Sequence, residues 1–299
     1  MNITNSIIST HQTSLDARSI TYKIGMFVIL LICSLAVFLL GSNYVQLFPT
    51  NGNWVYSAAT SATFFVAALV FKRRTKLAKY WPAAYAFFVA SIVNLVSDLF
   101  GGYNTDFVRL FGVSTSENWI IALAKMYETL LIVIPIIVLT LASGADLASI
   151  FLKVGNQYYK WGLGIGGLVL VNFFTSVLIF FGTGFDLPKL GSAIVWAFVF
   201  SICNAFSEEL WIRALFLKKV TPILGITGTI LLTSTTFAAL HFTSVAFLPA
   251  LAVPVFVINT FTLGLACGIL MQKTDSIWGA YLVHMAADVF LFIATLAVH

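Results

Sequence analysis

Hydrophobic residues fill nine long stretches of this 299-residue chain, and most polar residues lie between these stretches. About 20 residues of α-helix, at 1.5 Å per residue, are needed to cross about 30 Å of hydrocarbon. The pattern therefore predicts an all-α polytopic membrane protein with about nine transmembrane helices, with eight as the alternative count. The predicted spans are 24–46, 54–71, 80–100, 119–142, 161–183, 192–217, 225–243, 245–272 and 276–298.

Composition supports a membrane protein. Hydrophobic residues make up 60% of the chain and charged residues 9%, and the mean hydropathy is +0.98. Such a chain has too little polar surface to cover a water-soluble globule. Residues 1–23 are polar and lack the apolar core of a secretory signal, so we expect a cytoplasmic tail there.

The distribution of basic residues predicts the topology. Counts of Lys and Arg in successive connections alternate between higher and lower values, which favours a cytoplasmic N-terminus. The segment Lys72–Lys79 contributes most, as a topology anchor or, alternatively, as a site for anionic lipid. No continuous basic stripe indicates nucleic-acid binding. We expect a multi-pass integral protein of the plasma membrane of a prokaryote, with the lipid bilayer as its surroundings.

Ionisable residues interrupt the last predicted spans. Each one costs about 2.5–3.5 kcal/mol at membrane depth, so a group of them is a functional-site hypothesis. The earlier pair Lys125 and Glu128 shares a helix face and is expected either to form an ion pair or to contact substrate. The late group consists of Glu208, Glu209, Arg213, His241, His284 and Asp288.

Helical spacing predicts different roles for the two adjacent glutamates. Neighbouring helical residues point about 100° apart. Glu209 lies four residues before Arg213, which predicts an ion pair on one face. Glu208 then faces a different direction, towards a cavity, where it suits the role of general base.

The two histidines complete a candidate catalytic group. His284 and Asp288 are one helical turn apart and share a face. His241 reaches the same depth if its helix begins outside the membrane, which the turn residues between Thr221 and Gly228 permit. Glu208 and the other three residues would then surround one water-filled pocket.

The order of three short motifs adds a family resemblance. Glu-Glu-x-x-x-Arg, Phe-x-x-x-His and His-x-x-x-Asp, with Leu263-Gly264 between the last two, occur within residues 195–295. This set resembles the CPBP family of CAAX-processing and bacteriocin-processing intramembrane proteases, including type II CAAX prenyl endopeptidases. The resemblance implies that Glu208 and His241 activate water, while His284 and Asp288 position it or stabilise the oxyanion. Type II enzymes typically have Asn where Asp288 stands, and an ionised Asp cannot donate a hydrogen bond.

These observations favour an intramembrane endopeptidase. We expect it to hydrolyse a peptide bond of a membrane-associated or C-terminally processed protein or peptide, prenylated or not. Residues 24–190 would form scaffold helices and residues 191–299 the catalytic helices. A glutamate mechanism is preferred, and the alternative is a metalloprotease whose divalent metal, zinc, would be held by Glu208, His241, His284 and Asp288.

Two other functions remain open. The first is a catalytically inactive membrane scaffold or bacteriocin-immunity protein, because a fold does not fix a function. The second is a proton-coupled transporter that uses the same ionisable residues as relays.

Overall fold

The computed structural model describes residues 20–41, 52–101, 118–156, 159–181, 187–242 and 252–298. Within these ranges the chain is helical and contains no strand, which confirms the all-α class. The first helix is Ile20–Leu40, which ends in the π-helix η1 (Leu35–Leu40). The other helices are α2 (Asn53–Arg73), η2 (Ala78–Tyr80), α3 (Trp81–Phe100), α5 (Asn118–Ala142), η3 (Leu147–Ile150), α6 (Tyr159–Phe181), α7 (Leu187–Glu208), η4 (Glu209–Ala214), α8 (Leu215–His241), α9 (Val253–Thr274) and α10 (Trp278–Val298).

Every predicted span meets a helix, but the count of continuous spans differs. Seven described helices are long and apolar enough to cross a membrane. One of them, Leu190–His241, contains two predicted spans, because α7, η4 and α8 adjoin along the chain, although Gly225 within α8 has non-helical φ and ψ angles. Helix α6, which has 23 residues, covers most of the fifth predicted span. Residues 42–46, 182–183, 243 and 245–251 of the predicted spans lie outside the described residues.

The double-length helix folds back at Gly225. This residue has φ 76° and ψ 170°, a conformation that only glycine adopts readily. A straight helix would separate Glu208 from His241 by about 50 Å, yet their side chains lie 3.9 Å apart. Gly225 therefore forms the tip of a helical hairpin, with 17 residues from Glu208 to the tip (225 − 208) and 16 from the tip to His241 (241 − 225).

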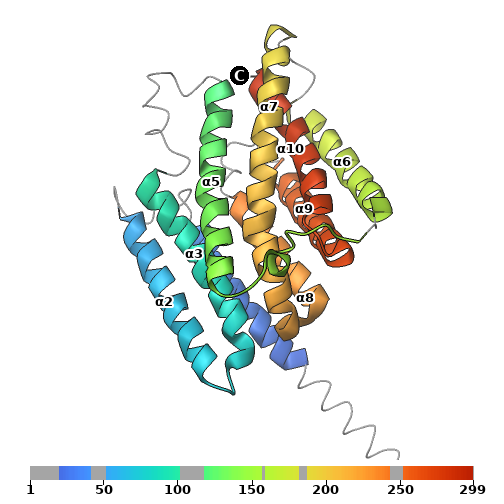
Figure 1. Ribbon diagram of the computed structural model, residues 1–299. Helices are drawn as coiled ribbons and strands as arrows, with labels where there is room; N and C mark the ends of the chain where they lie inside the picture. Colours follow the sequence, from blue (N-terminus) through green and yellow to red (C-terminus); the bar gives the residue numbers. More distant parts are fainter. Residues whose placement is uncertain are drawn as a thin grey trace, which may run out of the picture.

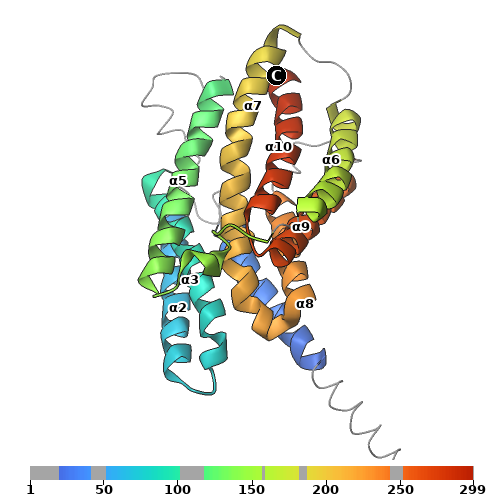
Figure 2. The same ribbon diagram turned by 45° about the vertical axis from the view of Figure 1, so that its right-hand side comes forward.

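The helices form one bundle with a layered order (Figures 1 and 2). Helix α2 packs on α3, which contacts α5 and α8; α7 lies between α5 and α10; α10 also contacts α6 and α9. The buried apolar core runs through this bundle and includes η4 and α8. Helix α9 begins at Val253, later than predicted, because Pro254 occupies its first turn.

Residues 143–156 cross one end of the bundle and bind the α9–α10 turn. The backbone N–H of Asn156 donates to the Thr274 carbonyl at 2.8 Å, and that of Ile277 donates to the Phe151 carbonyl at 3.0 Å. A Cβ at Gly155 would lie 2.3 Å from the Thr274 carbonyl oxygen, so only glycine permits this approach. The segment therefore fixes the start of α10, the helix that carries His284.

Candidate active site

A π-helical turn, η4, carries Glu209 and Arg213. A π-turn holds more residues than an α-turn, and such turns are frequent at functional sites. The predicted α-helical spacing is therefore wrong in detail, although Arg213 Nη1 does donate to Glu209 Oε1 across the turn. Both side chains are 0% exposed, so the ion pair lies entirely inside the protein.

Glu209 also contacts the last helix. Its Oε1 accepts a second hydrogen bond, from His284 Nδ1 at 2.8 Å. The Arg213 guanidinium lies 4.1 Å from the centre of the Phe237 ring. A Cβ at Gly264 would be 3.2 Å from Arg213 Nη2 and 3.0 Å from Ser234 Cα, so glycine leaves room for the guanidinium. This is a physical reason for glycine in the Leu263-Gly264 motif.

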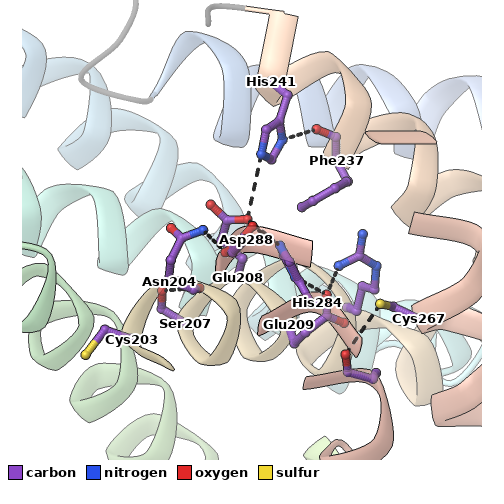
Figure 3. Close-up of polar contacts among 12 residues, drawn as sticks. Cys203, Asn204, Ser207, Glu208, Glu209, Phe237, His241, Cys267, His284 and Asp288 are labelled. Carbon is purple, nitrogen blue, oxygen red and sulfur yellow. Dashed lines mark hydrogen bonds and ion pairs between the residues drawn. The ribbon is translucent and has the colours of Figure 1, made fainter. Parts of the chain in front are cut away.

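His241 and His284 lie beside Glu208, and Asp288 lies beside His284 (Figure 3). Glu208 Oε2 is 3.9 Å from His241 Nε2 and 3.6 Å from His284 Nε2. His284 Nε2 is also 3.5 Å from Asp288 Oδ1. The structure thus brings together residues from α7, α8 and α10 that the sequence placed only by depth.

Burial divides these four residues into two pairs. The side chains of Glu208 and His241 are 14% and 21% exposed, whereas those of His284 and Asp288 are 1% and 7% exposed. Glu208 and His241 therefore form the accessible side of the group. His284 and Asp288 support it from the interior.

Hydrogen-bond partners orient both imidazoles in the same sense. His241 Nδ1 lies 2.9 Å from the Phe237 carbonyl oxygen, which can only accept, so Nδ1 carries the proton. His284 Nδ1 faces the Glu209 carboxylate in the same way. Both rings therefore direct Nε2 towards Glu208. Separations of 3.6 and 3.9 Å exceed a direct hydrogen bond but leave no space for a water between the two atoms, so a water would contact them from the side.

Two features of the site were not predicted from the sequence. Glu209 was assigned only to Arg213, and its contact with His284 was missed. Asn204, four residues before Glu208 on α7, donates from Nδ2 to Asp288 Oδ2 at 2.8 Å. An amide in an apolar span, one turn from Glu208, was the available signal.

The predicted metal ligands do not form a recognisable metal centre. Among the residues that the structure describes, no group of three or more His, Cys, Asp or Glu side chains is arranged to hold a metal ion.

The fold and this site define a polytopic membrane protein with a largely buried cluster of carboxylates, histidines and one arginine. Residues 190–290 match the family described as type II CAAX prenyl endopeptidase Rce1-like, which confirms the resemblance to the CPBP and CAAX protease family. Neither the curated proteins nor the solved structures contain a significant match. The family match supports a CAAX-type intramembrane endopeptidase.

Proposed function

We propose that the protein hydrolyses a peptide bond of a membrane-associated or C-terminally processed substrate with water activated by Glu208 and His241. The convergence of the Glu208 carboxylate, whose side chain is 14% exposed, and the Nε2 atoms of two histidines supports this proposal most directly. A carboxylate at this place can accept a proton, and the adjacent imidazoles can hold the water.

The reaction needs one water and returns its proton to the leaving group. Glu208 takes a proton from the water while the water oxygen bonds to the carbonyl carbon, and the carbonyl oxygen becomes an oxyanion. The C–N bond then breaks, and the amine leaves with the proton that Glu208 carried. His241 orients the water. His284, held by Glu209 and near Asp288, positions the attacked group and stabilises the developing charge.

An apolar cleft beside His241 supports a membrane-associated substrate. The cleft has a volume of about 630 Å³ and lies between the first helix, α8 and α9. Ala238 in its wall is three residues before His241. Such a surface suits a hydrophobic segment or a lipid chain on the substrate. The lining includes Leu39, Ala238, Phe242, Val257, Ile258 and Phe261.

Comparative proteomics tests this function. Membranes from cells with the native protein are compared with membranes from cells carrying Glu208→Gln. An uncut protein should accumulate in the variant, and its synthetic peptide, with and without a prenyl group, should be cleaved by the purified native protein only. Equal cleavage by both proteins would contradict the mechanism, and the two peptides decide whether prenylation matters.

We further propose that the end of the bundle near η2 and η3 faces the cytoplasm of a prokaryotic cell. Both short helices contact α8, so the Lys72–Lys79 segment and Lys218 lie at the same end. Basic residues gather there, as expected for a cytoplasmic face. A membrane-impermeant thiol reagent should label cysteines placed at Lys76 and Lys218 from the same side, only after the membrane is opened. Labelling of the two from opposite sides would contradict this topology.

A further inference from the structure

Asn204 and Asp288 form a contact between α7 and α10 that the mechanism above does not use. Asn204 Nδ2 donates to Asp288 Oδ2 at 2.8 Å, whereas the other Asp288 oxygen lies 3.5 Å from His284 Nε2. The bond to Asn204 is the shorter of the two interactions. It therefore fixes the direction of the Asp288 carboxylate more firmly than the contact with His284 does.

The surroundings make this bond important. Asn204 and Asp288 are 6% and 5% exposed, so water is a poor substitute for either partner. Asp288 also shares the interior with two further carboxylates, Glu208 and Glu209, which both approach His284. A neutral amide can satisfy one Asp288 oxygen without adding charge to this cluster.

The position of Asn204 on α7 extends its effect to Glu208. The two residues are four apart on the last turns of an α-helix and therefore share a face. A bond from Asn204 to Asp288 holds this face of α7 against α10. The separation of 3.6 Å between Glu208 Oε2 and His284 Nε2 depends on the same alignment.

We propose that Asn204 is a positioning residue for the reaction: its amide orients the side chain at 288 and so sets His284 relative to Glu208. This inference rests on the proposed endopeptidase function for its kinetic consequences. The geometric part of the proposal, that Asn204 acts on His284 through Asp288, can be tested without measuring any activity.

The first test uses histidine spectra and requires no substrate. Full-length protein labelled with ¹⁵N-histidine is purified in detergent micelles, and the His284 signals are assigned with His284→Gln. Asn204→Ala should shift the His284 Nε2 resonance, because Asp288 is released. The matched control is Asn172→Ala, which removes another interhelical amide bond, a partly buried one from Asn172 Nδ2 to Asn259 Oδ1 at 2.6 Å between α6 and α9. An unchanged His284 spectrum in Asn204→Ala, or an equal shift in the control, would overturn the proposal.

The second test is an exchange of the two side chains, measured on a peptide that the native protein cleaves. Asn204→Ala should lower kcat by about 10- to 100-fold, as for loss of other groups that orient an active-site residue. Asn204→Asp places two carboxylates in contact and should lower kcat further. The double variant Asn204→Asp/Asp288→Asn restores one amide and one carboxylate, and kcat should recover at least tenfold relative to Asn204→Asp.

The outcomes separate the two proposals. If Glu208→Gln retains full activity, the endopeptidase mechanism is wrong, and the spectra alone decide the role of Asn204. If Glu208→Gln is inactive but the exchanged pair does not recover, the Asn204 proposal is wrong while the endopeptidase remains. The melting temperature of each variant shows whether a loss comes from unfolding, and Asn172→Ala should lower it without lowering kcat.

Discussion

Two ion pairs inside the membrane-spanning helices have different surroundings. In α5, Lys125 donates to Glu128 at 2.9 Å, three residues along the same helix. In η4, Arg213 pairs with Glu209 four residues away, and Glu209 also accepts from His284 on α10. The side chains of the first pair are 5% and 13% exposed, while those of the second are 0% exposed.

The two pairs differ in whether the carboxylate also contacts a titratable group of another helix. Lys125 and Glu128 form the ion pair that was predicted. The Lys125 ammonium also lies 5.8 Å from the centre of the Phe200 ring. Glu209 instead links its cation to a histidine that faces Glu208. The informative feature is a carboxylate shared between a buried cation and a titratable group from another helix.

The largest expected effect is a loss of activity at Glu208 that has no counterpart at Glu128 in α5. Glu208→Gln removes the proton acceptor while keeping the shape of the side chain, so kcat should fall by about 10²- to 10⁴-fold with little change in melting temperature. Glu128→Gln changes the α5 pair in the same way and should retain native kcat. Assays on the cleaved peptide and thermal unfolding test both variants. Equal losses of kcat would remove the distinction between the regions.

The next effect concerns stability. Arg213→Ala leaves the Glu209 carboxylate buried without its cation and should destabilise the fold by about 3–5 kcal/mol. Lys125→Ala leaves the partly exposed Glu128 and should cost less, about 1–3 kcal/mol. Thermal unfolding in detergent and the yield of folded protein are the measurements. A larger loss for Lys125→Ala would reverse the comparison.

A smaller effect is expected at Asp288, which supports the histidine linked to Glu209. Asp288→Ala should lower kcat by about 100-fold, as when a group that stabilises the transition state is removed. Asp288→Asn should keep substantial activity, because its amide oxygen can still accept the hydrogen bond from Asn204. Kinetics of the two variants on the same peptide check this order.

Chelation is the companion measurement for the Asp288 variants. The glutamate mechanism predicts that purified enzyme survives prolonged treatment with a chelator. Inactivation that zinc reverses, together with an inactive Asp288→Asn variant, would establish a metalloprotease and contradict the proposed mechanism.

The smallest effect is expected for an ion pair at the surface, which completes the comparison with the two buried pairs. Asp275 binds Lys153 and lies 2.7 Å from Lys218 Nζ. Partial burial alone would raise the pKa of Asp275, but hydrogen bonds and charges from both lysines lower the pKa below its ordinary value of 3.8. The side chain is 39% exposed, so its contribution should be only about 0.2–1 kcal/mol.

The sign of this contribution sets its pH dependence. A carboxyl whose pKa is lower in the folded state stabilises the fold above its unfolded pKa, and this stabilisation is lost as the pH falls through the folded pKa. Asp275→Asn should therefore melt slightly below the native protein at pH 7 and equally with it well below pH 3.8. A difference that persists at the lowest pH would assign the effect to packing.

The sequence predicted the helical class and the meeting of Glu208, His241, His284 and Asp288, because hydrophobic windows and helical periodicity are local properties. It also predicted the pair of Glu209 with Arg213. It could not predict the π-turn at Glu209–Ala214, since the same residues suit an α-helix and only packing decides between them. Contacts between helices far apart in the chain, such as Asn204 with Asp288, depend on rotations that a single sequence does not specify. The division into residues 1–23, 24–190 and 191–299 stays a prediction.

The π-turn η4 also determines how the chain tolerates changes of length. A π-turn holds one more residue than an α-turn, and the helices on either side keep nearly the same relative rotation. Removing one of Leu210, Trp211 and Ile212 would therefore leave α7 and α8 close to their present orientation, but it would shorten the spacing from Glu209 to Arg213 from four residues to three. The Glu209 oxygen that accepts from both Arg213 and His284 would then have to shift. We expect a deletion here to be far more damaging than one in the turn between α2 and α3, which carries no candidate catalytic residue.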